Sequence, residues 1–163
     1  YGAYCMRISM NILANREDSE ENVSDTYLRV WNSVPPQRPH FLAAFLGRIA
    51  RNLALNRRAA ANAEKRGGGE AELSLEELAE CLPSGSEPQS EAEAAAFSHV
   101  LSDFLRTESK DARQVFLQRY FECRPVAQIA GHFGFSESKV KSMLMRTRTR
   151  LAQYLIREGW SDE

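Results

Sequence analysis

Five basic side chains gather in one short segment near the end of the chain. Between Lys139 and Arg150, in "KVKSMLMRTRTR", the sequence has five Lys or Arg residues and no Asp or Glu. The whole chain has a net charge of −1 at pH 7, so this concentration does not follow from the composition. Uncompensated cations attract polyanions such as a nucleic-acid backbone. The segment therefore predicts contact with a polyanion, and the alternative is a solvated basic face of a helix.

The residues before and within this segment have the spacing of a helix-turn-helix. Pro125 suits the first turn of a helix, Gly134 stands where a left-handed turn residue is needed, and Ser136 can cap the next helix. The apolar positions expected to face inward are Val126, Ile129, Ala130, Phe133, Val140, Leu144 and Leu151. The order of a small residue, a glycine and a buried valine is a more specific sign of a helix-turn-helix than a basic run alone. The pattern favours DNA binding over a solvated face.

In a helix-turn-helix the second helix enters the major groove of DNA by its N-terminal turns. Polar, basic and flexible side chains of this helix would then reach bases or nearby phosphates. The candidate DNA-binding residues are Ser138, Lys139, Lys141, Ser142, Met145, Arg146 and Arg148, and Arg150 follows at the end of the run.

Helical signals dominate the rest of the chain, because Leu, Ala, Arg, Glu and Gln are common and no stretch alternates like a strand. We expect an all-α fold with two small helical domains, 1–66 and 93–163, joined by a flexible acidic linker, 67–92. The expected helices before the helix-turn-helix cover about 1–15, 19–33, 40–62, 74–82, 89–107 and 109–122. Three glycines at 67–69 and the segment "PSGSEPQSE" are expected to be flexible.

The second and third expected helices have apolar and polar faces. Asp18 or Ser19 can cap the second helix. Its expected apolar face is Val23, Tyr27, Val30 and Trp31. Pro35, Pro36 and Pro39 end it. The third helix has an apolar stripe at Phe41, Phe45, Ile49, Leu53 and Leu55, and a polar side at Arg48, Arg51, Asn52, Asn56 and Arg57.

Charge is segregated along the chain. Residues 1–66 have ten Lys or Arg against six Asp or Glu, 67–110 have two against ten, and 111–163 have nine against six. Two basic ends separated by an acidic middle could bind a polyanion at two points. The three cysteines are far apart, and we expect reduced thiols.

The sequence gives no sign of membrane insertion or catalysis. It has no run of eighteen apolar residues, and its three His residues have no ligand spacing for zinc. Phosphate-binding loops, nucleophile elbows and paired carboxylates are also missing. We expect a protein that is not an enzyme and needs no cofactor or metal. The first residue is not Met, and we expect a few residues to precede it.

Three segments together resemble bacterial RNA polymerase sigma factors of the sigma-70 family. "REDSEENVSDTYLRVWNSV" is similar to the family's "DAEDxVQDTFLRVW", and "FLGRIARNLALNRR" to its "WLYRIARNLALNxxR". "ARQVFLQRYFECRPVAQIAGHFGFSESKVKSMLMRTRTRL" resembles "xxVFxLRYxExxSxxEIAxxLGxSxxTVKSRLxRARxxL". The resemblance covers about 1–62 and 93–157. The size and two-domain plan look like the extracytoplasmic-function (ECF) group.

This resemblance implies a division of labour. The first domain would dock on the clamp of the largest subunit of core RNA polymerase through Glu21, Asp25, Thr26 and Arg29. It would read and melt the minus-ten element through Arg38, His40, Arg48, Arg51, Asn52, Asn56 and Arg57. The candidate DNA-binding residues of the C-terminal helix would read the minus-thirty-five element. The acidic linker would enter the core enzyme.

The partners implied are core RNA polymerase, at its clamp and flap, promoter DNA and a helical anti-sigma factor. The implied location is the bacterial cytoplasm, on the nucleoid. Phe45, Gly47 and Met143 depart from the family pattern, so its sequence preference does not transfer. Two alternatives stay open: a stand-alone helix-turn-helix regulator, and an interaction module that does not touch DNA.

Overall fold

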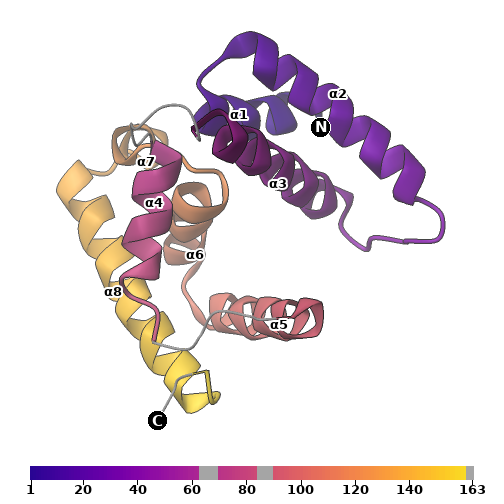
Figure 1. The fold of residues 1–163 in the computed structure, drawn as a ribbon. Coiled ribbons are helices and arrows are strands. Elements are labelled where there is room, and N and C mark those ends of the chain that lie inside the picture. Colours follow the sequence, from indigo (N-terminus) through magenta and orange to yellow (C-terminus); the bar gives the residue numbers. More distant parts are fainter. Residues whose placement is uncertain (63–69, 84–89, 161–163) are drawn as a thin grey trace. The chain divides into compact units, whose positions relative to one another are not determined.

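The regular structure of the chain is helical (Figure 1). A computed structural model describes residues 1–62, 70–83 and 90–160, and no strand occurs in these ranges. The elements are α1 (Gly2–Leu13), α2 (Arg16–Ser33), α3 (Leu42–Asn62), α4 (Glu70–Ala79), α5 (Glu91–Thr107), α6 (Lys110–Phe116), the π-helical turn η1 (Leu117–Phe121), α7 (Val126–Phe133) and α8 (Glu137–Arg157). The expected all-α class is confirmed.

The chain divides into two compact units. The first contains Tyr1–Leu73 and Phe121–Arg124, and the second contains Ser74–Tyr120 and Pro125–Glu163. The linker expected at 67–92 includes 67–69 and 84–89, which lie outside the described residues.

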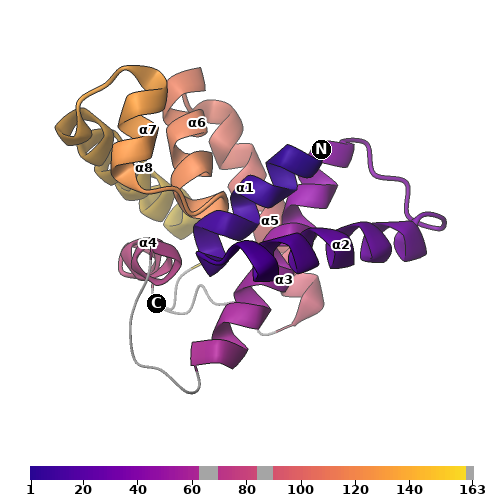
Figure 2. The same ribbon diagram turned by 90° about the horizontal axis from the view of Figure 1, so that it is seen from above.

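In the first unit, α1, α2 and α3 each pack against the other two (Figure 2). Their buried apolar side chains include Cys5, Ile8, Ile12, Leu46, Ala50 and Ala54. The alanines of α3 are small, so the helix backbones approach closely. These contacts hold the exposed sides of α2 and α3 in fixed directions.

The buried face of α2 differs from the expected one. Trp31 is 82% exposed and Tyr27 42% exposed, whereas Ser19, Asn22 and Thr26 are fully buried. These three residues recur at helical spacing, and their short polar side chains make hydrogen bonds inside the unit. The expected face is therefore wrong for Tyr27 and Trp31, whereas Val23 and Val30 do pack against the core. The short side chains of Ser19, Asn22 and Thr26 allow a closer approach of the helices than aromatic rings would.

The boundaries around α2 also differ from expectation. Asn15, not Asp18 or Ser19, caps the helix, and its side chain accepts a hydrogen bond from the Asp18 backbone N–H at 3.0 Å. After the proline-rich segment, Phe41 precedes α3 and is 79% exposed, so it does not belong to the buried stripe. Phe45 of that stripe is buried.

In the second unit, α8 contacts α5, α6 and α7 (Figure 1). Phe104, Val115, Phe116, Ile129, Leu144, Leu151 and Leu155 lie in its core. Serines at 90, 109 and 136 cap α5, α6 and α8, each accepting a backbone hydrogen bond from the helix that follows. Local caps and one apolar core thus fix the direction of α8.

The helix expected at about 74–82 begins earlier, at Glu70. Leu78 and Leu82 pack against the core of the second unit. This part of the acidic segment is therefore ordered against that unit.

Within the described ranges, no helix is both long enough and apolar enough to cross a membrane.

Candidate nucleic-acid interface

The turn between α7 and α8 has the geometry that the sequence predicted. Gly134 adopts φ 68°, in the left-handed region that favours glycine, directly after α7 ends. The hydroxyl of Ser136 accepts a hydrogen bond from the Lys139 backbone N–H at 3.1 Å. Pro125 is the N-cap of α7 and precedes its first turn. The helix-turn-helix expected from local turn chemistry is confirmed.

The inward positions of the two helices are also as expected. Val140 and Ile129 are fully buried, Leu144 and Leu151 are 1% exposed, and Val126 and Phe133 pack against the same core. With this spine turned inward, the opposite side of α8 faces solvent.

Most of the candidate DNA-binding residues lie on that solvent-facing side. Ser138, Lys139, Lys141, Met145 and Arg146 are exposed, and Ser142 is half-buried. The Nε of Arg146 donates a hydrogen bond to the backbone carbonyl of Ser142 at 3.2 Å. Three exposed cations, Lys139, Lys141 and Arg146, thus come from about the first three turns of one helix.

Arg148 is placed differently. It pairs with the carboxylate of Glu77 on α4, and its guanidinium lies 2.6 Å from the Tyr120 hydroxyl. Arg119 also pairs with Glu77, at 3.2 Å, and the Arg119 and Arg148 side chains are 6% and 14% exposed. This position contradicts the expectation that Arg148 lies on the exposed DNA-binding face.

The same cluster changes the ionisation of Tyr120. Its hydroxyl donates to Glu77, and burial, followed by this hydrogen bond, raises the pKa of Tyr120 well above its ordinary value. Arg150 is also engaged, because its Nε and Nη2 pair with the two oxygens of Glu108 at 2.9 Å and 2.6 Å. The five cations therefore separate into Lys139, Lys141 and Arg146, which are exposed, and Arg148 and Arg150, which are held by carboxylates.

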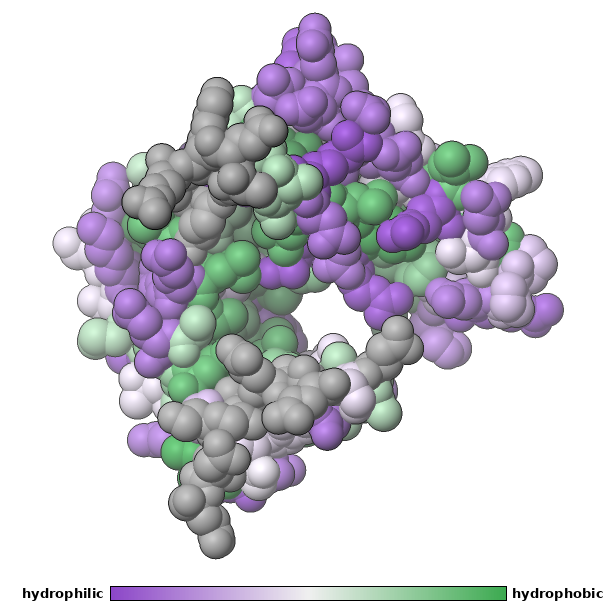
Figure 3. All heavy atoms as spheres, in the orientation of Figure 1, coloured by the Kyte–Doolittle hydropathy of each residue, from purple (hydrophilic) through white to green (hydrophobic). Residues whose placement is uncertain are grey.

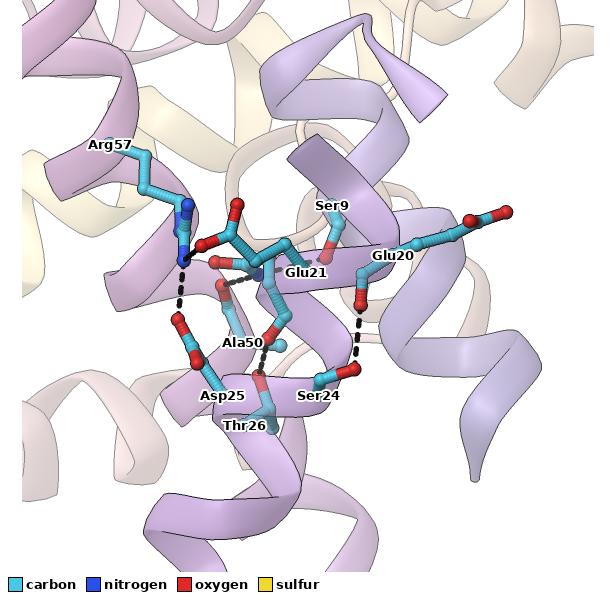
Figure 4. Close-up of polar contacts among 9 residues, drawn as sticks. Ser9, Glu20, Glu21, Ser24, Asp25, Thr26, Ala50 and Arg57 are labelled. Atoms are coloured by element: carbon cyan, nitrogen blue, oxygen red, sulfur yellow. Dashed lines mark hydrogen bonds and ion pairs between the residues drawn. The ribbon is translucent and has the colours of Figure 1, made fainter. Parts of the chain in front are cut away.

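In the first unit, two of the candidate docking residues lie together on α2. Glu21 and Asp25 both pair with Arg57 of α3, the Glu21 contact measuring 3.1 Å (Figure 4). Arg29 is exposed on the same helix. Thr26 is fully buried and donates to the Asn22 carbonyl at 2.7 Å, which corrects its expected surface role.

Asn22 holds the three helices of the first unit together. Its side-chain nitrogen donates to the Ser9 hydroxyl and to the Ala50 carbonyl, both at 2.9 Å (Figure 4). Sequence reasoning missed this residue. The signal was the polar stripe of Ser19, Asn22 and Thr26 at helical spacing.

The candidate melting residues do not form one uniform surface. Arg38, His40, Arg48, Asn52 and Asn56 are exposed, whereas Arg51 and Arg57 are half-buried. Burial lowers the pKa of Arg51, whose guanidinium lies 5.8 Å from the ring centroid of Phe121. Arg57, a candidate melting residue, therefore contacts two of the candidate docking residues on α2.

Apolar side chains also reach the surface of α2. Leu28 is 60% exposed, and a groove between α2 and α3 is lined by Asp25, Leu28, Arg29, Asn32, Ser33 and Leu53. Figure 3 shows hydrophilic residues over α2 with hydrophobic ones among them. A groove lined by both charged and apolar side chains suits a protein partner better than a bare polyanion.

Comparison with known families agrees with the resemblance of the three segments. Residues 1–64 match the model of sigma-70 region 2, and residues 109–151 match the model of sigma-70, region 4. A search of curated proteins finds no match. The chain belongs to the sigma-70 family of sigma factors, and its pairing of regions 2 and 4 is typical of the ECF group.

Proposed function

We propose that the two units of this sigma factor make two separate promoter contacts, which core RNA polymerase holds at a fixed spacing. As a sigma factor, the chain binds promoter DNA and directs RNA polymerase to it. The alternative of a stand-alone regulator is not favoured, since it would need no sigma-70 region 2.

The second unit would read the minus-thirty-five element with α8. The observation that carries this assignment is the Gly134–Ser136 turn followed by exposed Lys139, Lys141 and Arg146. Ser138, Ser142 and Met145 lie within the same turns and would contact base edges or phosphates. Arg148 is left out of this set because Glu77 engages it.

The first unit would dock on the clamp of the largest polymerase subunit. The groove lined by Asp25, Leu28 and Arg29 supports this placement, because it combines opposite charges with apolar surface. The flap of the polymerase would bind the second unit.

Melted minus-ten DNA would bind the exposed polar residues of the proline-rich segment and α3. Arg38, His40, Arg48, Asn52 and Asn56 can hold phosphates or unstacked base edges. Arg51 and Arg57 would contribute less to the binding of melted DNA, since both are half-buried.

Sigma-70 family proteins are not enzymes, and we propose that this chain supplies binding free energy while polymerase performs the bond chemistry. Sigma factors act in the cytoplasm, and we propose nucleoid association during initiation. A helical anti-sigma factor would act by covering the α2 groove and the exposed side of α8.

Run-off transcription with purified core polymerase and genomic fragments tests the function and identifies a promoter. Variants of the candidate DNA-binding residues of α8 are then tested on that promoter. Changing Lys141→Ala together with Arg146→Ala should abolish initiation at that promoter and leave core binding intact. Arg106→Ala is the matched control, because Arg106 is an exposed cation of the same unit paired with Asp103 on α5. Unchanged transcription by the double variant would reject the reading role of α8.

A further inference from the structure

The ammonium of Lys139 lies over an aromatic ring at the start of α8. Its Nζ is 3.7 Å from the ring centroid of Phe135. An ammonium above a ring face within about 6 Å is attracted by the electron-rich face of the ring. The contact therefore restricts a long side chain that is otherwise exposed to solvent.

The ring itself is held in place. Phe135 follows the left-handed Gly134 and precedes the capping Ser136, so its backbone is fixed on both sides. It stacks on Phe133, with 5.5 Å between ring centroids and 15° between the planes. Both rings pack against the core of the second unit. The Lys139 ammonium therefore contacts a ring whose position is fixed by its neighbours.

Lys139 is an unfavourable residue for its place in the helix. It is the third residue of α8, where the backbone dipole presents positive charge and favours Asp or Glu. The ring of Phe135 offsets part of this conflict. A local conflict of this kind that is compensated by a neighbour is a sign of a functional position.

We propose that Phe135 is a positioning residue that fixes the Lys139 ammonium for contact with a base edge in the major groove. This inference rests on the proposed function of α8. The chemistry expected at the contact is an ammonium donating to the O6 and N7 acceptors of guanine. With one side of the ammonium covered by the ring, its remaining protons point away from the protein toward such acceptors.

Fixing the ammonium gives sequence discrimination as well as affinity. A free lysine can contact many phosphates with similar energy, whereas a lysine held at one place meets one base pair. The ring of Phe135 stays beneath the Lys139 ammonium in the DNA complex, so the ring does not compete with DNA for the ammonium. Removing the ring should therefore weaken the contact between Lys139 and the base.

The test is a double-mutant cycle in the holoenzyme, formed from core polymerase and the full chain. Phe135→Leu keeps an apolar side chain without a ring, Phe135→Tyr keeps the ring, and Lys139→Gln removes the charge. Affinity is measured on the promoter recovered by run-off transcription and on versions with each base pair of the upstream element changed in turn. Phe135→Leu should weaken binding to the intact promoter about two- to fivefold, the range of an exposed cation–π contact.

Three results decide the proposal. In the Lys139→Gln background, Phe135→Leu should cost nothing more, and Phe135→Tyr should bind like the wild type. Both Phe135→Leu and Lys139→Gln should lose discrimination at the same G·C pair. An equal loss with Phe135→Leu in both backgrounds would show a packing role alone and overturn the proposal, as would tighter binding by Phe135→Leu.

The same measurements separate this inference from the proposed function. If Lys139→Gln weakens every sequence equally, Lys139 contacts a phosphate and the base-reading inference fails while promoter binding stands. If the wild-type chain starts no transcription with core polymerase, the function itself fails before any variant is compared.

Discussion

Arg57 on α3 is held by Asp25 on α2, so a residue expected to bind melted DNA is paired with one expected to dock on polymerase. Glu21 contacts the same guanidinium (Figure 4). The Asp25, Glu21 and Arg57 side chains are 44%, 64% and 29% exposed, so the pairs are screened by water. They orient side chains on the surface and contribute little to the stability of the unit.

Changing Asp25→Asn together with Arg29→Ala should weaken recovery of core polymerase with the chain. The free energy of unfolding should fall by no more than about 1 kcal/mol, because the Asp25–Arg57 pair that is lost is partly exposed. Co-purification with core enzyme and chemical denaturation of the same preparation measure the two effects separately.

The matched control for this docking prediction is Glu20→Gln. Glu20 is an exposed carboxylate of the same helix, and it pairs with Arg16 at 2.8 Å. Its removal should leave recovery unchanged. Full recovery of polymerase with the Asp25 and Arg29 variant would move the docking surface away from this part of α2.

Glu77 should be the most sensitive carboxylate of α4. It is the partner of Arg119 and Arg148, and its loss leaves two poorly exposed cations near each other. Glu77→Gln should lower the free energy of unfolding by about 3 kcal/mol, the lower part of the range for a broken buried pair. Denaturant titration of the full chain measures it.

Glu76→Gln provides the control for Glu77, since Glu76 is exposed on the same helix. Its effect should stay within about 0.5 kcal/mol. Adding Arg148→Gln to Glu77→Gln should cost less than the sum of the single changes, because only one of the two cations that Glu77 paired then remains. Additive losses would mean that Glu77 and Arg148 do not interact.

The helix-turn-helix could be predicted from the sequence because its determinants are local. A glycine with positive φ, a serine cap and apolar residues at helical spacing act over a few residues. The same local pattern predicts which basic residues face solvent, because the direction of each side chain depends on the buried residues of the same helix. These basic residues are Lys139, Lys141 and Arg146.

The partners of charged residues could not be predicted in the same way. Arg148 looks like its basic neighbours in the sequence, and its burial depends on Glu77, which lies 71 positions earlier. Trp31 and Tyr27 look like core residues by type, but Asn22 and Thr26 occupy the buried face. Asn22 donates a hydrogen bond to α3, and Thr26 donates one to the Asn22 carbonyl within α2. Both errors arose because tertiary contacts overrode local composition.

Ionisation of the Tyr120 hydroxyl should make the free energy of unfolding depend on pH in the alkaline range. Its pKa is raised in the folded chain, so its protonated form contributes stability that is fully present below the ordinary value near 10. That contribution is lost as pH rises through the folded pKa, because the unfolded chain releases the proton first. The free energy of unfolding should therefore fall above about pH 10, by at most about 1.4 kcal/mol per pH unit for this one group.

Tyr120→Phe isolates this effect. The variant should be less stable at neutral pH, since the hydroxyl contacts Glu77 and Arg148, but its stability should fall less steeply above about pH 10. Denaturation at several pH values, with tyrosinate absorbance as a second signal, gives both slopes. Parallel slopes for the two proteins would show that Tyr120 titrates normally in the folded chain.

Gly47 is required by the ring of Tyr4. A Cβ added at Gly47 would lie 2.7 Å from the Tyr4 hydroxyl oxygen and 2.8 Å from its Cε1, so the ring would have to move. In an open helix interior, Gly→Ala stabilises by about 1 kcal/mol. Gly47→Ala should instead lower the free energy of unfolding by about 1 kcal/mol, because overpacking exceeds the helical gain.

Two comparisons separate crowding from helix propensity at this position. Gly131→Ala, in α7, should be stabilising, because beyond its chain neighbours and the nearby backbone of α7 no atom lies within 4 Å of the added Cβ. Gly47→Ala in a Tyr4→Ala background should also be stabilising, by about 0.5–1 kcal/mol, since the obstructing ring is absent. The two results together would explain why glycine stands where the resembling family motif has tyrosine, because the Tyr4 ring of α1 occupies the space beside Gly47 of α3. A Gly47→Ala change that stabilises the unaltered chain would mean that Tyr4 moves aside at no cost.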